Sequence, residues 1–210
     1  MGYTSTLTAR ERLIDTARSL FAADGVEAVS LRAVARQAEQ RNTNAVQYHF
    51  EDRTGLLAAV LEPHHQQVTA RRVALLEPLA PLDDPPLRAL ADALVRPSAA
   101  MLEEPGGLSY LRIVAELIDD PPRLFRFGDA GLGQWSDIAK RRMPDETYPL
   151  HRRLAAIQLC FQELGRRAKA RRRTDHRLFV SNLTDLVSAL LDAEVSPDTV
   201  ALLEERDARR

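Results

Sequence analysis

The sequence predicts an all-α fold in two parts, a three-helix N-terminal domain (residues 8–52) and a larger helical domain (residues 53–210). Apolar residues recur at helical spacing along most of the chain, and glycines and prolines separate the segments in which they do. Hydrophobic residues make up 45% of the 210, which is enough for packed cores. A chain of this length has room for a small domain followed by a larger one.

The first predicted helix begins at a capping box. Thr8 and Glu11 have the spacing at which two side chains satisfy each other's backbone N–H groups. An apolar stripe of helical period follows, and Gly25 suits the position just after the last turn. The stripe consists of Leu13, Ile14, Ala17, Leu20 and Phe21.

Residues 30–50 have the pattern of two short helices divided by a polar turn. Ser30 is a suitable N-cap for the first helix, which carries its apolar residues at helical spacing from Leu31 to Ala38. The turn, residues 39–42, contains no apolar anchor. We expect the second helix to start at Asn42 or Thr43 and to end at Phe50. Such a short helix needs tertiary packing to be stable.

The outward face of the second helix carries groups that suit a DNA major groove. Amide side chains pair with adenine edges, arginine with guanine, and hydroxyl groups with phosphates. The pair of helices therefore favours a helix-turn-helix whose second helix is the recognition helix, although the same side chains also suit a solvated surface. The candidate DNA contacts on the first helix, the turn and the second helix are Arg32, Arg41, Asn42, Thr43, Asn44, Gln47, Tyr48 and His49.

The flanking segments add a family resemblance. RERLIDTARSLFAADG, then VS-LRAVARQA, then the YHF that ends the recognition helix, then a basic residue before GLL, together resemble the TetR family of bacterial transcriptional regulators over residues 9–61. The resemblance implies that Gln47, Tyr48 and His49 lie near DNA. It also implies that Arg53 takes the place of the family's phosphate-binding lysine, and that Ser30 touches a phosphate.

The chain departs from the family pattern at two places. Glu39 stands where the family usually has glycine, in a turn that looks one residue longer. Val46 and Gln47 replace the family's usual Leu-Tyr. The geometry of the turn and the identity of the base-contacting side chains are therefore less well defined than the family itself.

The charge balance argues against a nonspecific nucleic-acid binder. The net charge is −1, and residues 1–60 hold seven arginines against seven acidic residues. Specific binding requires the arginines to share one face. A rival interpretation is an all-α ligand-binding protein or enzyme whose N-terminal helices do not bind DNA.

The larger domain is expected to begin with a long helix that runs from Arg53 toward Leu79. Pro63 should kink or divide this helix. Prolines 78, 81, 85 and 86 mark a loop, and helices are expected over residues 87–102 and 108–118. Residues 123–143 combine aromatics with glycines and allow a short helix, a loop and another helix.

Aromatic and polar residues in the middle of the chain suggest a pocket for a small-molecule effector. Ligand pockets are mostly apolar with a few polar groups. The same aromatics also suit the hydrophobic core, and Arg112 and Glu116 also suit an i,i+4 ion pair. The candidate lining residues are Met101, Tyr110, Arg112, Glu116, Phe125, Phe127 and Trp135.

The last third of the chain has the clearest periodicity. Two apolar seams, over residues 150–168 and 179–193, advance in steps of four and three and predict two helices that form a four-helix interface with a second copy. The alternative is that both seams are buried within one subunit. The expected interface residues are Leu154, Ile157, Phe161, Leu164, Phe179, Leu183, Leu186 and Leu190.

The sequence lacks the common catalytic and cofactor motifs, including a Walker loop, GxGxxG in a strand-turn-helix setting, HExxH and GxSxG. A single cysteine, Cys160, rules out a cysteine-cluster metal site. We therefore expect no enzymatic activity, no cofactor and no metal. No apolar run is long enough for a membrane span and the N-terminus has no signal-peptide core, so we expect a cytoplasmic protein. The expectation as a whole is a homodimeric repressor that binds a palindromic double-stranded operator and leaves it when an effector binds.

Overall fold

The computed structural model describes residues 8–40, 45–118, 130–143, 149–170 and 175–209, and within these ranges the regular elements are all helical. The helices are α1 (Ala9–Asp24), α2 (Leu31–Gln37), α3 (Ala45–Phe50), α4 (Arg53–Leu76), α5 (Leu87–Ala99), α6 (Gly107–Leu117), α8 (Ala130–Arg142), α9 (Arg152–Lys169), α10 (His176–Asp192) and α11 (Pro197–Asp207). Short 3₁₀ turns, η1 (Glu77–Leu79) and η2 (Ala100–Leu102), follow α4 and α5. The predicted all-α class is confirmed.

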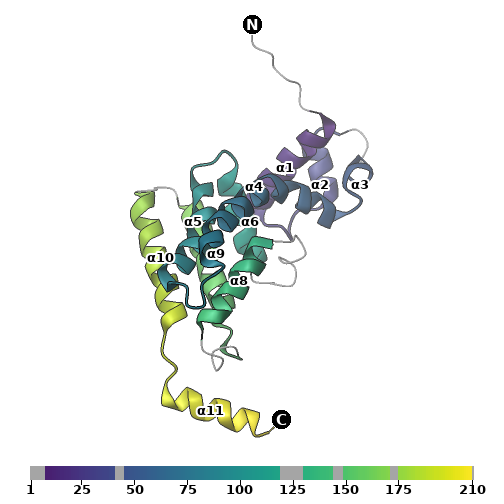
Figure 1. Cartoon of the computed structure of the whole chain (residues 1–210). Coiled ribbons are helices and arrows are strands. Elements are labelled where there is room, and N and C mark those ends of the chain that lie inside the picture. The colour runs from purple at the N-terminus through teal and green to yellow at the C-terminus, as the bar shows by residue number, and fades with distance from the viewer. Residues whose placement is uncertain (1–7, 41–44, 119–129, 144–148, 171–174, 210) are drawn as a thin grey trace.

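The helices form a small group and a larger group joined by α4 (Figure 1). Helices α1, α2 and α3 pack together at one end, where α1 and α3 also contact α4. Helix α4 then runs into the larger group, where it packs against α5 and α8. The buried apolar side chains form one continuous cluster that extends from Leu13 in α1 to Leu191 in α10. The two groups therefore share a core rather than lying side by side.

The capping box predicted at the start of α1 is present. The Thr8 hydroxyl accepts from the backbone N–H of Glu11 at 3.2 Å, and the Glu11 carboxylate accepts from the backbone N–H of Thr8 at 2.8 Å. The hydrogen bond from the Thr8 backbone N–H, followed by one that the Thr8 hydroxyl donates at 2.9 Å, lowers the pKa of the Glu11 carboxyl. The start of α1 is thus set by residues 8–11 themselves.

Helix α4 continues through Pro63, so of the two expected effects of this proline, a kink or a division of the helix, the division does not occur. A proline inside a helix removes one backbone hydrogen bond and costs about 3 kcal/mol. Val60, Leu61 and Val68, which flank the proline, are all buried. Tertiary packing on both sides of Pro63 therefore outweighs the local preference for a break.

Helix α6 lies inside the larger group and α11 lies outside it. Nearly every apolar side chain of α6 is buried, and α6 packs against α9 and against α1.

Helix α11 stands away from the rest of the molecule beyond α10 (Figure 1). Its N-cap is Ser196, whose hydroxyl accepts from the Thr199 backbone N–H at 3.3 Å. None of the α11 side chains is buried within the chain. None of the described helices is both long and apolar enough to cross a bilayer.

Candidate nucleic-acid interface

Helix α2 is fixed by its cap and by one apolar face. The Ser30 hydroxyl accepts from the Ala33 backbone N–H at 3.1 Å, so the predicted N-cap is confirmed. Val34, Ala35 and Ala38 are buried, whereas Arg32 is exposed. Since the Ser30 hydroxyl serves the cap, the phosphate contact implied for this residue stays a prediction.

The turn after α2 is a Schellman motif with a glutamate where glycine is favoured. The backbone N–H of Glu39 donates to the Arg36 carbonyl at 3.1 Å, and that of Gln40 donates to the Ala35 carbonyl at 3.0 Å. Glu39 itself has φ 54°, in the left-handed region, which costs a residue with a Cβ about 1–2 kcal/mol. The departure from the family's glycine therefore falls at the position of this turn where glycine has a conformational advantage.

Helix α3 is anchored by two buried side chains and presents others to solvent. Val46 and Phe50 are buried, and Gln47 and Tyr48 are exposed, Tyr48 to 86%. His49 is half-buried, and its ring meets the Tyr48 ring edge-on at 5.2 Å. The described part of α3 thus has the inward and outward faces that the sequence predicts. The remaining candidates on this side, Arg41, Asn42, Thr43 and Asn44, lie outside the described residues.

The junction between α3 and α4 is closed by short hydrogen bonds from backbone N–H groups. The Asp52 carboxylate accepts from the Gly55 backbone N–H at 2.8 Å and so caps α4. The Asp52 backbone N–H in turn donates to the Phe50 carbonyl at 2.6 Å. Glu51, between the two helices, has φ 60°. Two short connections therefore set the angle at which α3 leaves α4.

Arg53 lies in the first turn of α4, and two of its guanidinium nitrogens have no hydrogen-bond partner among the described residues. Its Nε and Nη2 atoms are covered, yet neither has a hydrogen-bond acceptor among the residues that the structure describes. Covered guanidinium N–H groups are costly unless they find an acceptor, and a phosphate oxygen supplies a well-matched one. The position is therefore chemically suited to the phosphate contact that the resemblance implies.

Arg10 is a residue of this region whose role the sequence did not reveal. Its guanidinium carbon lies 5.2 Å from the centre of the Phe50 ring, within the range of a cation–π contact. The contact joins the start of α1 to the end of α3, 40 residues apart in sequence. The spacing of apolar residues within one helix does not indicate which residues of two distant helices will contact each other.

Three of the seven acidic side chains in residues 1–60 have local roles as caps or in an ion pair. Glu11 completes the α1 capping box, Asp52 caps α4, and Asp15 pairs with Arg18 at 2.6 Å. Arg32 and Arg36, by contrast, are exposed on α2. Because the exposed Glu39 follows α2 closely, the surface around this helix carries both signs of charge.

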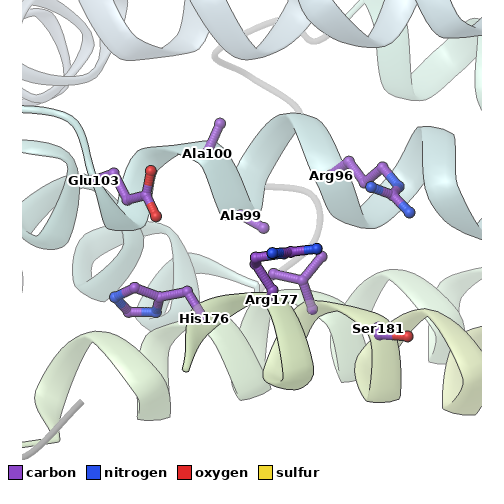
Figure 2. A pocket seen from close by; sticks show the side chains of 8 residues that line it. Arg96, Ala99, Ala100, Glu103, His176, Arg177 and Ser181 are labelled. Atoms are coloured by element: carbon purple, nitrogen blue, oxygen red, sulfur yellow. The ribbon is translucent and has the colours of Figure 1, made fainter. Parts of the chain in front are cut away.

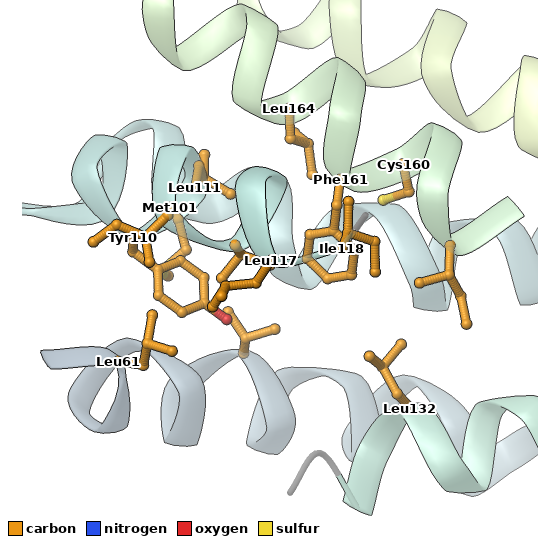
Figure 3. Close-up of a cluster of buried hydrophobic side chains, with 14 of the residues drawn as sticks. Leu61, Met101, Tyr110, Leu111, Leu117, Ile118, Leu132, Cys160, Phe161 and Leu164 are labelled. Atoms are coloured by element: carbon orange, nitrogen blue, oxygen red, sulfur yellow. The ribbon is translucent and has the colours of Figure 1, made fainter. Parts of the chain in front are cut away.

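Of the residues expected to line a ligand pocket, three lie in the hydrophobic core. Met101, Tyr110 and Trp135 are at most 2% exposed, and Figure 3 shows Met101 and Tyr110 among packed leucines. The Trp135 indole N–H donates to the Leu90 carbonyl at 2.8 Å. Phe125 and Phe127 lie outside the described residues. The alternative core interpretation thus accounts for the described aromatics.

Arg112 and Glu116 turn to separate backbone partners. The Arg112 guanidinium donates to the Ala168 carbonyl at 3.0 and 3.3 Å. The Glu116 carboxylate accepts from the Val26 backbone N–H at 2.8 and 3.0 Å. Both polar groups therefore link α6 to other parts of the chain.

A cleft of about 400 Å³ lies elsewhere, between the end of α5 with η2 and the start of α10 (Figure 2). It contains none of the predicted pocket residues. Its lining combines charged and polar side chains with small apolar ones and is formed by Arg96, Ala99, Ala100, Glu103, His176, Arg177, Val180 and Ser181.

The two predicted C-terminal seams are divided between the interior and the surface. Ile157, Phe161, Leu164 and Leu183 are buried within the chain, where α9 packs on α6 and α10 packs on α5. Leu154, Phe179 and Leu190 are half-buried, and Leu186 is 47% exposed. Leu178, which lies outside the predicted seam, is 69% exposed. The apolar surface available to a second copy is therefore on the outer side of α10, around Leu178 and Leu186.

Comparison with known proteins gives a sequence match to the N-terminal helices and a structural match to the whole chain. The family model for bacterial regulatory proteins of the tetR family matches residues 13–60. The crystal structure of AmtR from Mycobacterium smegmatis has a TM-score of 0.58 and 17% identity, with 99% of this chain and 98% of that chain covered, which shows a shared fold. A Mesorhizobium loti protein assigned to the TetR family has a TM-score of 0.48 and 18% identity, with 88% of this chain and 95% of that chain covered, which is too low to establish a common fold. No curated protein matches the sequence significantly.

Proposed function

Because this chain belongs to the TetR family of bacterial regulatory proteins and is thus a DNA-binding transcriptional regulator, we propose that it acts as a homodimeric repressor. In this proposal the dimer binds a palindromic operator and dissociates from it when a small molecule binds. The proposed DNA recognition rests on one observation, which is that α3 has one buried apolar face and one exposed polar face. Val46 and Phe50 hold the helix in the core, while Gln47 and Tyr48 project into solvent. An exposed amide on an anchored helix is suited to reading an adenine edge.

The proposed DNA contacts divide by chemistry. Gln47 reads a base, and Tyr48, His49 and residues 41–44 supply further contacts to DNA. Arg53 binds a phosphate, because two of its covered nitrogens have no acceptor among the described residues. Arg32, exposed on α2, adds a second phosphate contact, and Ser30 a third. Phosphate contacts fix the position of the protein, and base contacts supply the sequence preference.

The proposed dimer uses the outer side of α10 together with α9. Leu178 and Leu186 expose large apolar surfaces two helical turns apart, and the half-buried Phe179 and Leu190 extend the same region. The guanidinium carbon of Arg167 lies 5.0 Å from the centre of the Phe179 ring and flanks it. Self-association of this face in a two-fold dimer removes the leucines from water and supplies two recognition helices for two half-sites.

The proposed release mechanism requires an effector with unequal affinity for two arrangements of the dimer. A ligand that binds both arrangements equally shifts nothing, whatever its affinity. Helix α4 passes from the recognition helix into the larger helical group, so a displacement within that group changes the position of α3. The separation of the two α3 helices is then the quantity that the effector alters.

Selection of binding sites from a pool of random DNA duplexes tests the proposed function. We expect the full-length protein to enrich a sequence with two inverted half-sites whose centres lie about one helical turn, or a multiple of it, apart. Recovery of no motif would contradict DNA recognition. Recovery of a single, unrepeated half-site would contradict the proposed dimer but not DNA recognition.

A further inference from the structure

Glu116 makes a contact that joins the larger helical group to the N-terminal helices. Its two carboxylate oxygens lie 2.8 and 3.0 Å from the backbone nitrogen of Val26, a residue 90 positions earlier in the chain. Val26 is fully buried in the connection between α1 and α2. A carboxylate that accepts from a backbone N–H forms a charge-assisted hydrogen bond, about twice as strong as a neutral one.

The backbone conformation at Gly25 directs the chain toward this contact. Gly25 ends α1 with φ 94°, a conformation that residues with a Cβ rarely adopt. A Cβ built on Gly25 would lie 3.4 Å from one Glu116 oxygen. The end of α1 is thus shaped so that the next N–H, that of Val26, faces the α6 carboxylate.

Helix α6, which carries Glu116, is itself locked to α9. One turn before Glu116, the Arg112 guanidinium holds the Ala168 carbonyl near the end of α9, and the Gln162 amide donates to the Ala115 carbonyl at 3.0 Å. At Gly165 the two helices approach so closely that an added Cβ would lie 2.2 Å from the Cβ of Ala115. Such tight packing leaves little freedom for α6 to slide along α9.

These contacts form a chain from the proposed dimer interface to the DNA-binding helices. Helix α9 holds α6, and α6 holds the connection between α1 and α2 through Glu116 and Val26. The other links between the two groups are α4, which is covalent, and the packing of α1 against α4 and α6. The Glu116 contact adds a directional hydrogen bond at the connection between α1 and α2, and so restricts the orientation of the N-terminal helices more closely than apolar packing alone.

We propose that Glu116 is a positioning residue for operator binding, and that its grip on the Val26 backbone sets the distance between the two recognition helices of the dimer. Glu116 does not touch DNA. It acts by preventing the N-terminal helices from rotating about the start of α4. This inference rests on the proposed dimeric function and adds to it a residue that governs half-site spacing.

The test measures spacing discrimination separately from base discrimination. The duplex selected by the wild-type protein is remade with its central spacer lengthened or shortened by one and two base pairs, and in a second set with single base changes in one half-site. Affinities of wild type, Glu116→Ala, Glu116→Gln and Glu104→Ala are measured for both sets. Glu104 is the matched control, because its ion pair with Arg71, 2.8 Å long, lies within the larger helical group.

We expect Glu116→Ala to bind the selected duplex about tenfold more weakly, the loss that corresponds to one charge-assisted hydrogen bond. Its affinity should fall much less than that of the wild type when the spacer changes, while the penalty for each half-site base change stays the same. Glu116→Gln keeps one acceptor oxygen for the Val26 N–H and should restore most of the spacing discrimination. Glu104→Ala should behave as the wild type.

Two results overturn this inference but leave the proposed function intact, and a third contradicts the proposed function itself. If Glu116→Ala, or Glu116→Gln in the event that the alanine variant does not fold, loses spacing and base discrimination together, Glu116 serves only general stability. If Glu116→Ala keeps the spacing discrimination of the wild type, Glu116 does not position the recognition helices. A wild-type selection that returns no two-half-site duplex contradicts the proposed function itself and removes the basis of this inference.

Discussion

The carbonyl oxygen of Phe50 occupies the space that a Cβ on Gly55 would need. The two would be 2.1 Å apart, and the obstructing atom belongs to the backbone, which cannot turn aside as a flexible side chain does. The last residue of the recognition helix and the first turn of α4 are therefore in direct contact at this point. Glycine is required here by space, at a place where the position of α3 is decided.

Gly55→Ala should consequently destabilise the protein by roughly 1–3 kcal/mol and displace α3. Thermal unfolding followed by circular dichroism measures the stability, and affinity for the selected duplex measures the displacement. Gly133→Ala in α8 is the matched control, because nothing lies within 4 Å of a Cβ at that position. The control should gain about 0.5–1 kcal/mol from helix propensity. Equal effects of the two changes would contradict the contact at Phe50.

Glu39→Gly should stabilise the protein by about 1 kcal/mol, because Glu39 has φ 54° in a Schellman turn and glycine adopts this conformation without strain. Urea unfolding at neutral pH measures the change. Glu39→Ala removes the same carboxylate but keeps a Cβ, so it should give no comparable gain. A gain of equal size in both variants would show that charge, and not the backbone conformation, disfavours Glu39.

Gln47→Ala and Arg53→Ala should weaken DNA binding in different ways. Loss of the Gln47 amide should cost roughly 1–3 kcal/mol on the selected duplex and relax the preference at one base pair. Loss of the Arg53 guanidinium should lower the affinity for every duplex and reduce the slope of log affinity against log salt by about one. Binding titrations at several salt concentrations separate the two. An unchanged base preference in Gln47→Ala would remove this residue from base reading.

Leu178→Glu and Leu186→Glu should shift the protein from dimer to monomer. Each leucine buried at an interface contributes about 1.5–3 kcal/mol, and a two-fold interface contains each of them twice. Sedimentation velocity over a concentration series measures the shift. Leu202→Glu on α11 is the matched control, because Leu202 is 64% exposed but lies away from the proposed interface. If all three variants sediment as the wild type, the dimer uses another surface.

The elements that local sequence determines could be predicted, and the contacts between distant segments could not. The caps at Thr8 and Ser30 follow from short spacings and are present in the structure. The continuity of α4 through Pro63 depends on burial against other helices, which no local pattern reports. The same limit applies to Glu116, whose partner is 90 residues away.

The C-terminal helices illustrate a second limit. A seam of period 3.5 predicts that one face is buried, but it does not say which neighbour covers that face. Phe161 and Leu183 satisfy the pattern by packing inside their own chain, and the exposed Leu178 lies next to the seam rather than on it. The helices themselves were predictable, whereas the side that remains available to a partner was not.

A chemical property of Cys160 makes the central proposal directly testable. Cys160 is fully buried, and burial raises the pKa of its thiol to about 12, so at pH 8 the thiol is protonated and covered. Thr54 is exposed in the first turn of α4, next to Arg53. In a Thr54→Cys variant the new thiol is therefore the accessible one, and an iron chelate can be attached there without altering α3.

Cleavage of the selected duplex by this iron-bearing protein tests most directly whether two recognition helices face one DNA molecule. We expect two clusters of strand breaks, related by the symmetry of the palindrome and separated by about one helical turn or a multiple of it. A single cluster, or breaks spread evenly along the duplex, would contradict the two-fold placement of α3 against DNA.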